Sequence, residues 1–166
     1  MAEADWEASL GDAIASTDGP TALVGIGNIL RGDDAVGLKI ASKLRSSLGP
    51  APARGIRIHR AADAPEMLLS KLAASGTRII IFDAVDASAD PGKIVCAKLG
   101  DTKYGFFATH NIPLKIVPGL AERLNDVLVV GVQPESLEVG ERLSDVVKRS
   151  AGRVVEAVTR AVEAMS

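Results

Sequence analysis

Two segments rich in carboxylates and one histidine are the parts of this sequence whose side chains could do chemistry together. Asp33 and Asp34 follow a short apolar run, Asp83 ends another, and His110 stands in a polar segment between two predicted elements. If the two apolar runs are neighbouring parallel strands, the polar residues that follow them face one another across the edge of a sheet. Two carboxylates and a neutral imidazole then suit several divalent first-row ions, although they do not by themselves specify which one.

Each of these residues also has a structural interpretation. Adjacent acids at a helix start, such as Asp33 and Asp34, often cap the helix or interact with its dipole. An aspartate after an apolar strand, such as Asp83, often caps a turn. His110 precedes a predicted helix, where a single histidine is commonly structural. The residues taken one at a time therefore leave both interpretations open.

Other reactive or glycine-rich positions point to structure. His59 lies in a predicted strand without acidic neighbours, and Cys96, the one cysteine of the chain, is predicted to be a small packed side chain. The turn Gly25-x-Gly27 has Leu30 where a dinucleotide-binding fingerprint needs its third glycine. The acids that follow would also repel a pyrophosphate, so a nucleotide site is not expected there.

The elements that position these residues alternate between strands and helices. Short apolar runs predict strands over 21–26, 56–60, 78–84, 93–98 and 127–132. Helical spacing of apolar residues predicts helices over 5–16, 34–48, 65–74, 112–124 and 143–166. Continuous apolar strands between amphipathic helices favour an α/β sandwich with a mainly parallel sheet covered on both faces. One domain over residues 1–166 is expected, with residues 1–20 as an N-terminal helical extension.

Composition excludes several functional classes. The 166 residues are 47% hydrophobic and 24% charged, with a formal net charge of -2 and no basic cluster. A non-specific nucleic-acid surface is therefore not expected. The single cysteine cannot form an internal disulfide, and no run approaches the roughly 18 apolar residues of a membrane span. The acidic N-terminus lacks the features of a secretory signal, so we expect a cytoplasmic protein without membrane insertion.

Together, the motifs resemble the hydrogenase maturation endopeptidases. The matching blocks are Gly25-x-Gly27-Asn28-Ile29-Leu30-x-Gly32-Asp33-Asp34-x-x-Gly37, Ala64-Pro65-Glu66, Asp83-Ala84-x-Asp86, Pro91-Gly92-Lys93-Ile94, Thr109-His110-Asn111-x-Pro113-Leu114 and Gly131-Val132-Gln133-Pro134. They occur in the family's order and cover about residues 21 to 160. The combination is most similar to the branch that serves formate-hydrogenlyase-type and coenzyme-F420-reducing hydrogenases. Residues 59–63 depart from the pattern, which bears on the loop after the second strand.

The resemblance implies a fold, a substrate and a site. The fold is a three-layer α/β/α sandwich of the phosphorylase/hydrolase-like type, with a mixed five-stranded sheet of order 2-1-3-5-4 and the fourth strand antiparallel. The activity is removal of the C-terminal extension from a [NiFe]-hydrogenase large-subunit precursor after nickel insertion. Asp34, Asp83 and His110 are implied to be the catalytic, nickel-contacting residues. The nickel is carried by the precursor and is not tightly bound to this chain.

The chemistry of the residues is compatible with such an activity but leaves its mechanism open. A metal can polarise the scissile carbonyl and activate a water molecule. Alternatively, Asp34 or Asp83 is a general base and the metal positions the peptide. No Gly-x-Ser-x-Gly nucleophile elbow is present.

Three other functions are weighed against the protease. A response-regulator-like receiver also places paired acids after its first strand and an aspartate after its third, but it needs a lysine where this chain has residues 131–135 without one. A nickel-sensing chaperone would bind the precursor without changing its mass. An unrelated small metallohydrolase would bind its metal tightly in isolation, unlike a protease whose nickel arrives with the substrate.

Overall fold

The computed structural model describes residues 3–16, 19–53, 55–101, 105–106, 117–140 and 142–165 of the chain. The strands are β1 (Thr21–Ile26), β2 (Ile56–Ala61), β3 (Arg78–Asp86), β4 (Ile94–Lys98), β5 (Gly105–Phe106) and β6 (Leu128–Val132). The α-helices are α1 (Glu3–Ala15), α2 (Val36–Leu48), α3 (Pro65–Ala74) and α4 (Asp145–Glu163), with 3-10 turns η1 (Gly32–Ala35) and η3 (Ala121–Arg123). None of the helices in these ranges is long and apolar enough to cross a membrane.

The strands form a mixed sheet of order β2-β1-β3-β6-β4, from which the short β5 branches by pairing with β3. β1 runs parallel to both of its neighbours, β3 runs parallel to β6, and β4 runs antiparallel to β6. With β5 set aside, this is the predicted order 2-1-3-5-4 with an antiparallel fourth strand. The prediction of the sheet is confirmed.

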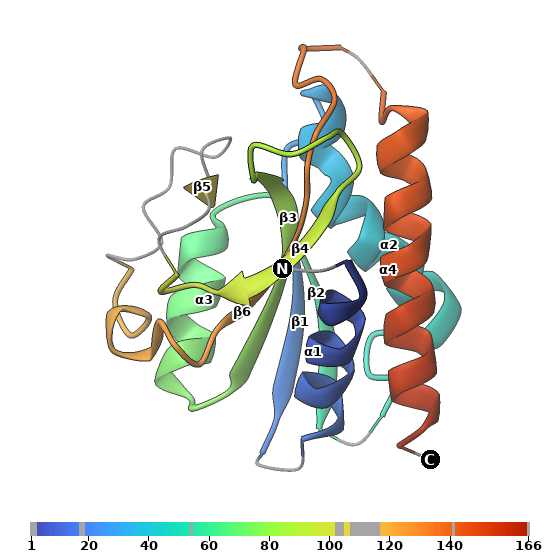
Figure 1. Cartoon of the computed structure of the whole chain (residues 1–166). Coiled ribbons are helices and arrows are strands. Elements are labelled where there is room, and N and C mark those ends of the chain that lie inside the picture. The colour runs from blue at the N-terminus through green and yellow to red at the C-terminus, as the bar shows by residue number, and fades with distance from the viewer. Residues whose placement is uncertain are drawn as a thin grey trace.

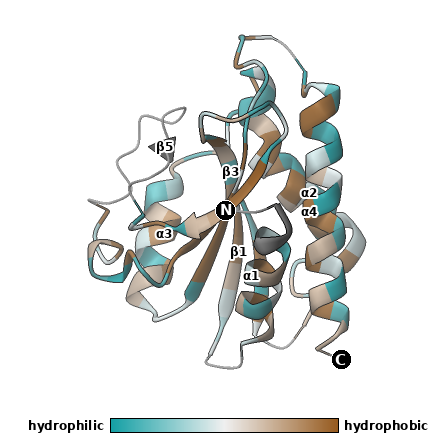
Figure 2. Ribbon diagram, viewed as in Figure 1, coloured by the Kyte–Doolittle hydropathy of each residue, from teal (hydrophilic) through white to brown (hydrophobic). Residues whose placement is uncertain are grey.

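Helices cover both faces of the sheet, as Figure 1 shows. Along β1, Leu23 faces one side while Ala22 and Val24 face the other, because successive side chains of a strand point to opposite faces. All six residues of β1 are buried. Figure 2 shows the same arrangement as hydrophobic strands at the centre and hydrophilic helix surfaces outside.

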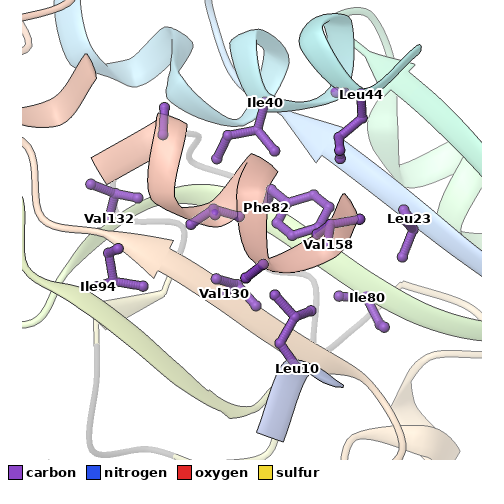
Figure 3. Close-up of a cluster of buried hydrophobic side chains, with 14 of the residues drawn as sticks. Leu10, Leu23, Ile40, Leu44, Ile80, Phe82, Ile94, Val130, Val132 and Val158 are labelled. Atoms are coloured by element: carbon purple, nitrogen blue, oxygen red, sulfur yellow. The ribbon is translucent and has the colours of Figure 1, made fainter. Parts of the chain in front are cut away.

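One face of the sheet is covered by α1, α2 and α4. Leu10 of α1, Ile40 of α2 and Val158 of α4 pack with Phe82 of β3 in one buried cluster, shown in Figure 3. Trp6 of α1 is also wholly buried in this cluster, and the Arg153 guanidinium of α4 lies 5.7 Å from the centre of its ring. The predicted N-terminal helix is therefore part of the packed body of the protein.

The other face is covered by α3 and by the chain over 117–124. Leu69 of α3, Val117 and Leu120 are buried there against strand residues such as Ile81. The predicted helix over 112–124 is wrong for its described part, since only the short turn η3 forms; residues 112–116 lie outside the described residues. Pro118 cannot donate a backbone hydrogen bond and Gly119 takes a positive φ of 86°, so the segment folds into successive turns. The apolar spacing correctly predicted burial but not the helix.

The strand predicted over 21–26 and the helix predicted over 65–74 form with the predicted bounds, whereas the remaining elements form with slightly shifted ends. β3 extends to Asp86, beyond the predicted residue 84, because Val85 and Asp86 pair antiparallel with Phe106 and Gly105. The predicted helix over 34–48 begins as the turn η1 and becomes α-helical at Val36. The second shift matters because Asp34 of the predicted site lies in η1 and not in the α-helix.

Candidate active site

Asp34 and Asp83 lie at the same edge of the sheet. Asp34 is in η1, which follows β1, and Asp83 is near the end of β3, the parallel neighbour of β1. The sheet continues from β1 to β2 on one side and to β3 on the other, so the strand order reverses here, as at the ligand crevice of open α/β sheets. Both side chains are buried, with 1% of Asp34 and 0% of Asp83 exposed. The first part of the predicted constellation is thus assembled.

Two glycines allow this close approach. A Cβ atom on Gly37, in the first turn of α2, would collide with the carbonyl oxygens of Ile26 and Phe82. A Cβ atom on Gly25, in β1, would collide with the Gly37 carbonyl. The start of α2 therefore packs directly against the backbone of β1 and β3, which holds Asp34 beside Asp83. The glycines of the sequence motif serve helix-to-sheet packing and not phosphate binding.

The two carboxylates affect each other electrostatically. The pKa of Asp83 is raised well above its usual value, first by burial and second by the negative charge of Asp34. The Ala84 backbone N–H donates a 2.8 Å hydrogen bond to Asp83 Oδ1, which acts in the opposite direction but does not cancel the shift. A buried pair of like charges of this kind favours either a proton or a cation between the two groups.

Asp33, the sequence neighbour of Asp34, has a different role. Its Oδ2 accepts hydrogen bonds from the backbone N–H groups of Glu135 and Ser136, at 2.8 and 3.2 Å. It also accepts one from the Ser144 hydroxyl at 2.8 Å, while its Oδ1 accepts the Ser144 N–H at 2.7 Å. Asp33 therefore ties η1 to the loop after β6 and to the N-cap residue of α4. The structural interpretation holds for Asp33, although its partners belong to another part of the chain and not to its own helix.

His110, the third predicted site residue, lies outside the described residues, as does the rest of its motif, 109–114. Within the described ranges, no group of three or more His, Cys, Asp or Glu side chains is arranged to hold a metal ion. Asp34 and Asp83 are thus the part of the predicted nickel-contacting set that the structure brings together.

Comparison with known proteins decides the family. A family model described as hydrogenase maturation protease, HycI, matches residues 57–161, which is well over half of the chain. The chain belongs to the hydrogenase maturation protease family. The family model, a relative and a structural neighbour are each named as a protease or endopeptidase, so we assign this chain as a maturation endopeptidase.

Individual relatives agree with this assignment. The Escherichia coli hydrogenase 3 maturation protease is 31% identical over 116 residues, covering 68% of this chain and 72% of the relative. The crystal structure of a [NiFe] hydrogenase maturation protease, HycI, from Thermococcus kodakarensis superposes with a TM-score of 0.76 at 27% identity, covering 93% and 99% of the two chains. The solution structure of the endopeptidase HycI from Escherichia coli gives a TM-score of 0.68 at 26% identity, with 82% and 87% covered.

Gln133 is a residue of the protease for which the sequence alone indicated no role. Its Oε1 accepts hydrogen bonds from the backbone N–H groups of Ala87 and Ala89, at 2.7 and 3.3 Å. Its own backbone N–H donates to the Lys93 carbonyl at 2.9 Å. Gln133 thereby fixes the loop that follows Asp83 and Asp86. Gln133 belongs to the Gly131-Val132-Gln133-Pro134 block and directly follows a predicted strand, and this position in the sequence could have indicated a role at the end of the sheet.

Two other reactive side chains of the protease lie apart from this edge. Cys96 is buried in β4 within the core, and burial raises the pKa of its thiol to about 12. It is thus a poor nucleophile, in accord with its predicted packing role. His59 in β2 has its pKa lowered by burial and then by the charges of Arg45 and Arg57, and no acidic group is among the causes.

The protease also has concave surface at both edges of its sheet. A pocket of about 450 Å³ is lined by Asp86, Gln133 and residues 134–138, next to the carboxylate edge. A larger one of about 600 Å³ lies at the opposite edge, where Arg78 begins β3 and Leu128 begins β6. The smaller pocket opens at the end of the sheet where Asp86 ends β3 and Gln133 follows β6, the end at which ligands bind in open α/β sheets.

Proposed function

We propose that this protease is a nickel-dependent endopeptidase that removes the C-terminal extension of a [NiFe]-hydrogenase large-subunit precursor after nickel insertion. Asp34, Asp83 and His110 contact nickel that the precursor carries. The client belongs to the formate-hydrogenlyase-type or coenzyme-F420-reducing branch, and the reaction takes place in the cytoplasm.

The meeting of Asp34 and Asp83 is the observation that carries this proposal. Both carboxylates are buried at one edge of the sheet, and each raises the cost of ionising the other. A divalent ion between them would remove that cost, and carboxylate oxygens are acceptable ligands for such an ion. Two or three protein ligands leave coordination positions open for groups of the precursor, which favours a metal that arrives with the substrate.

The same arrangement supports two routes to amide hydrolysis. In the first, the substrate's nickel polarises the carbonyl and activates a water molecule, while Asp34 and Asp83 hold the metal. In the second, Asp83 is the general base, for which a raised pKa is favourable, and the metal positions the peptide. The proposal includes both, because each requires the two carboxylates and the nickel-loaded precursor.

The decisive experiment is intact-mass measurement of the precursor after incubation with the protease, with and without nickel loaded. Loss of a C-terminal peptide from the nickel-loaded form alone is expected. Asp83→Asn should leave the mass unchanged, whereas Asp12→Asn, an exposed carboxylate on α1 that lines the opposite-edge pocket, should process like wild type.

The other outcomes each identify a different function. Binding of the nickel-loaded precursor without any change in mass would favour the non-cleaving chaperone. Cleavage regardless of nickel loading, by protein that binds metal in isolation, would favour an unrelated metallohydrolase. The receiver interpretation predicts a signalling family, and the match to a protease family argues against it.

A further inference from the structure

Three exposed aliphatic side chains gather at the carboxylate edge of the sheet. Ile29 and Leu30, in the loop between β1 and η1, are 60% and 65% exposed, and Val139, in the loop between β6 and α4, is 77% exposed. Exposed apolar residues scattered singly need no explanation, but a contiguous group at a functional edge indicates an interaction site. We call Ile29, Leu30 and Val139 the rim patch.

Hydrogen bonds join the two loops that carry the rim patch. The Gly140 N–H donates to the Leu30 carbonyl at 2.8 Å, so the backbone next to Val139 is bonded to the backbone of Leu30. The Asp33 N–H donates to the Ser136 carbonyl at 2.9 Å, and the Asp33 side chain binds the same loop. The two loops that carry the patch are therefore held together, although Leu30 and Val139 are 109 positions apart in the sequence.

Hydrogen bonds also connect the loop of Ile29 and Leu30 to the carboxylate site. The Leu30 N–H donates to Asn28 Oδ1 at 2.9 Å, which makes a tight turn that fixes the backbone of the exposed pair. The Asn28 N–H donates to the Asp34 carbonyl at 3.2 Å, which closes the loop onto Asp34, a residue of the proposed site. A fixed surface loses little conformational entropy when a partner binds.

We infer that the rim patch is where an apolar segment of the large-subunit precursor packs while its nickel meets Asp34 and Asp83. This inference rests on the proposed function. The patch and Asp34 belong to one closed loop, so a substrate that brings its metal to Asp34 from outside comes to lie over Ile29 and Leu30. The size of the patch favours this occupant over a second copy of the chain, because three side chains are far fewer than the roughly 20–30 residues a side of a stable interface. A substrate held at the neighbouring carboxylates needs only this additional contact.

The test is steady-state kinetics of peptide release from the nickel-loaded precursor by an Ile29→Ser/Leu30→Ser double variant and by Val139→Ser. KM should rise by about tenfold or more in the double variant while kcat stays within about twofold of wild type. Met165→Ser, which removes an exposed apolar side chain beyond the end of α4, is the matched control and should leave KM unchanged. All of these side chains are exposed, so thermal unfolding should be little changed in every variant.

Affinity measured in an Asp83→Asn background separates binding from cleavage. There the double variant should bind the precursor about tenfold more weakly. Unchanged KM and affinity in the double variant would overturn the rim-patch inference and leave the proposed function intact, whereas a wild-type protein that fails to cleave would count against the proposed function itself. A fall in kcat at constant KM, or concentration-dependent self-association that Leu30→Ser abolishes, would also overturn the inference.

Discussion

Asp33 and Ser144 are joined by two hydrogen bonds, from the Ser144 N–H at 2.7 Å and from its hydroxyl at 2.8 Å, although 111 residues separate them. The same carboxylate accepts two further backbone N–H groups from the loop after β6. The negative charge of its neighbour Asp34 instead acts on Asp83, whose pKa it raises. Two adjacent and chemically identical residues thus act on different parts of the chain, Asp33 on the loop after β6 and the start of α4, and Asp34 on Asp83.

Replacing Asp33 should cost stability. Asp33→Ala removes the buried acceptor of four part-buried hydrogen bonds, so we expect the free energy of unfolding to fall by about 2 kcal/mol. Urea unfolding followed by circular dichroism measures this value. Precursor affinity should also fall, because Asp33 positions the loop that carries Val139. A loss below about 0.5 kcal/mol would show that the loop is held by other contacts.

Asp83→Asn should stabilise the free protease near neutral pH while abolishing processing. Because the folded pKa of Asp83 lies above its unfolded value of 3.8, this group contributes stability below that pH and loses the contribution as pH rises through the folded pKa. Asparagine carries no charge to bury and retains an oxygen to accept the Ala84 N–H. Urea unfolding at intervals from about pH 4 to pH 8 should therefore show that the free energy of unfolding of the variant increases relative to that of wild type as pH rises. Parallel stability profiles would contradict the assigned shift.

Processing should fall at acidic pH through His110. An imidazole must be neutral to bind a metal, and its unperturbed pKa is about 6.5. A pH-rate profile of peptide release should show the loss, and His110→Ala should be inactive but folded. His59 is the other of the two histidines, so His59→Gln is the matched control and should keep the wild-type profile. If the loss of peptide release at acidic pH disappeared in His59→Gln, the responsible group would be His59 and not His110.

Gly37→Ala should be strongly destabilising, whereas Gly152→Ala should be tolerated. The added Cβ on Gly37 would collide with the Ile26 and Phe82 carbonyl oxygens, which are backbone atoms of the sheet and cannot move aside. Gly152, in the interior of α4, has nothing within 4 Å of that position, and alanine there should stabilise the helix by roughly 0.5–1 kcal/mol. Thermal unfolding of the pair compares the same chemical change in two environments. Similar effects of both substitutions would mean that α2 can shift on the sheet.

The sequence predicted five of the six strands, and the family resemblance supplied the sheet order that places β1 beside β3; the short β5 was not predicted. Buried strands such as Thr21–Ile26 are continuous apolar runs, a pattern that is visible in the local sequence. The family motifs implied the order of the strands in the sheet. The helix over 112–124 could not be predicted correctly, because burial gives Val117 and Leu120 a helix-like spacing even when Pro118 and Gly119 turn the backbone. Apolar periodicity indicates which side chains are inside and leaves open how the chain connects them.

Local sequence determined that Asp33, Asp34 and Asp83 would gather at one edge, since the ends of neighbouring parallel strands meet there. The resemblance already pointed to Asp34 for the site, but only the tertiary structure showed which groups Asp33 binds and which charge acts on Asp83. These interactions depend on groups far along the chain, such as Ser144 and the Glu135 N–H for Asp33 and the buried β3 backbone for Asp83. The sequence records the chemistry of each side chain, but hydrogen bonding and charge repulsion depend on distances that exist only once the chain has folded.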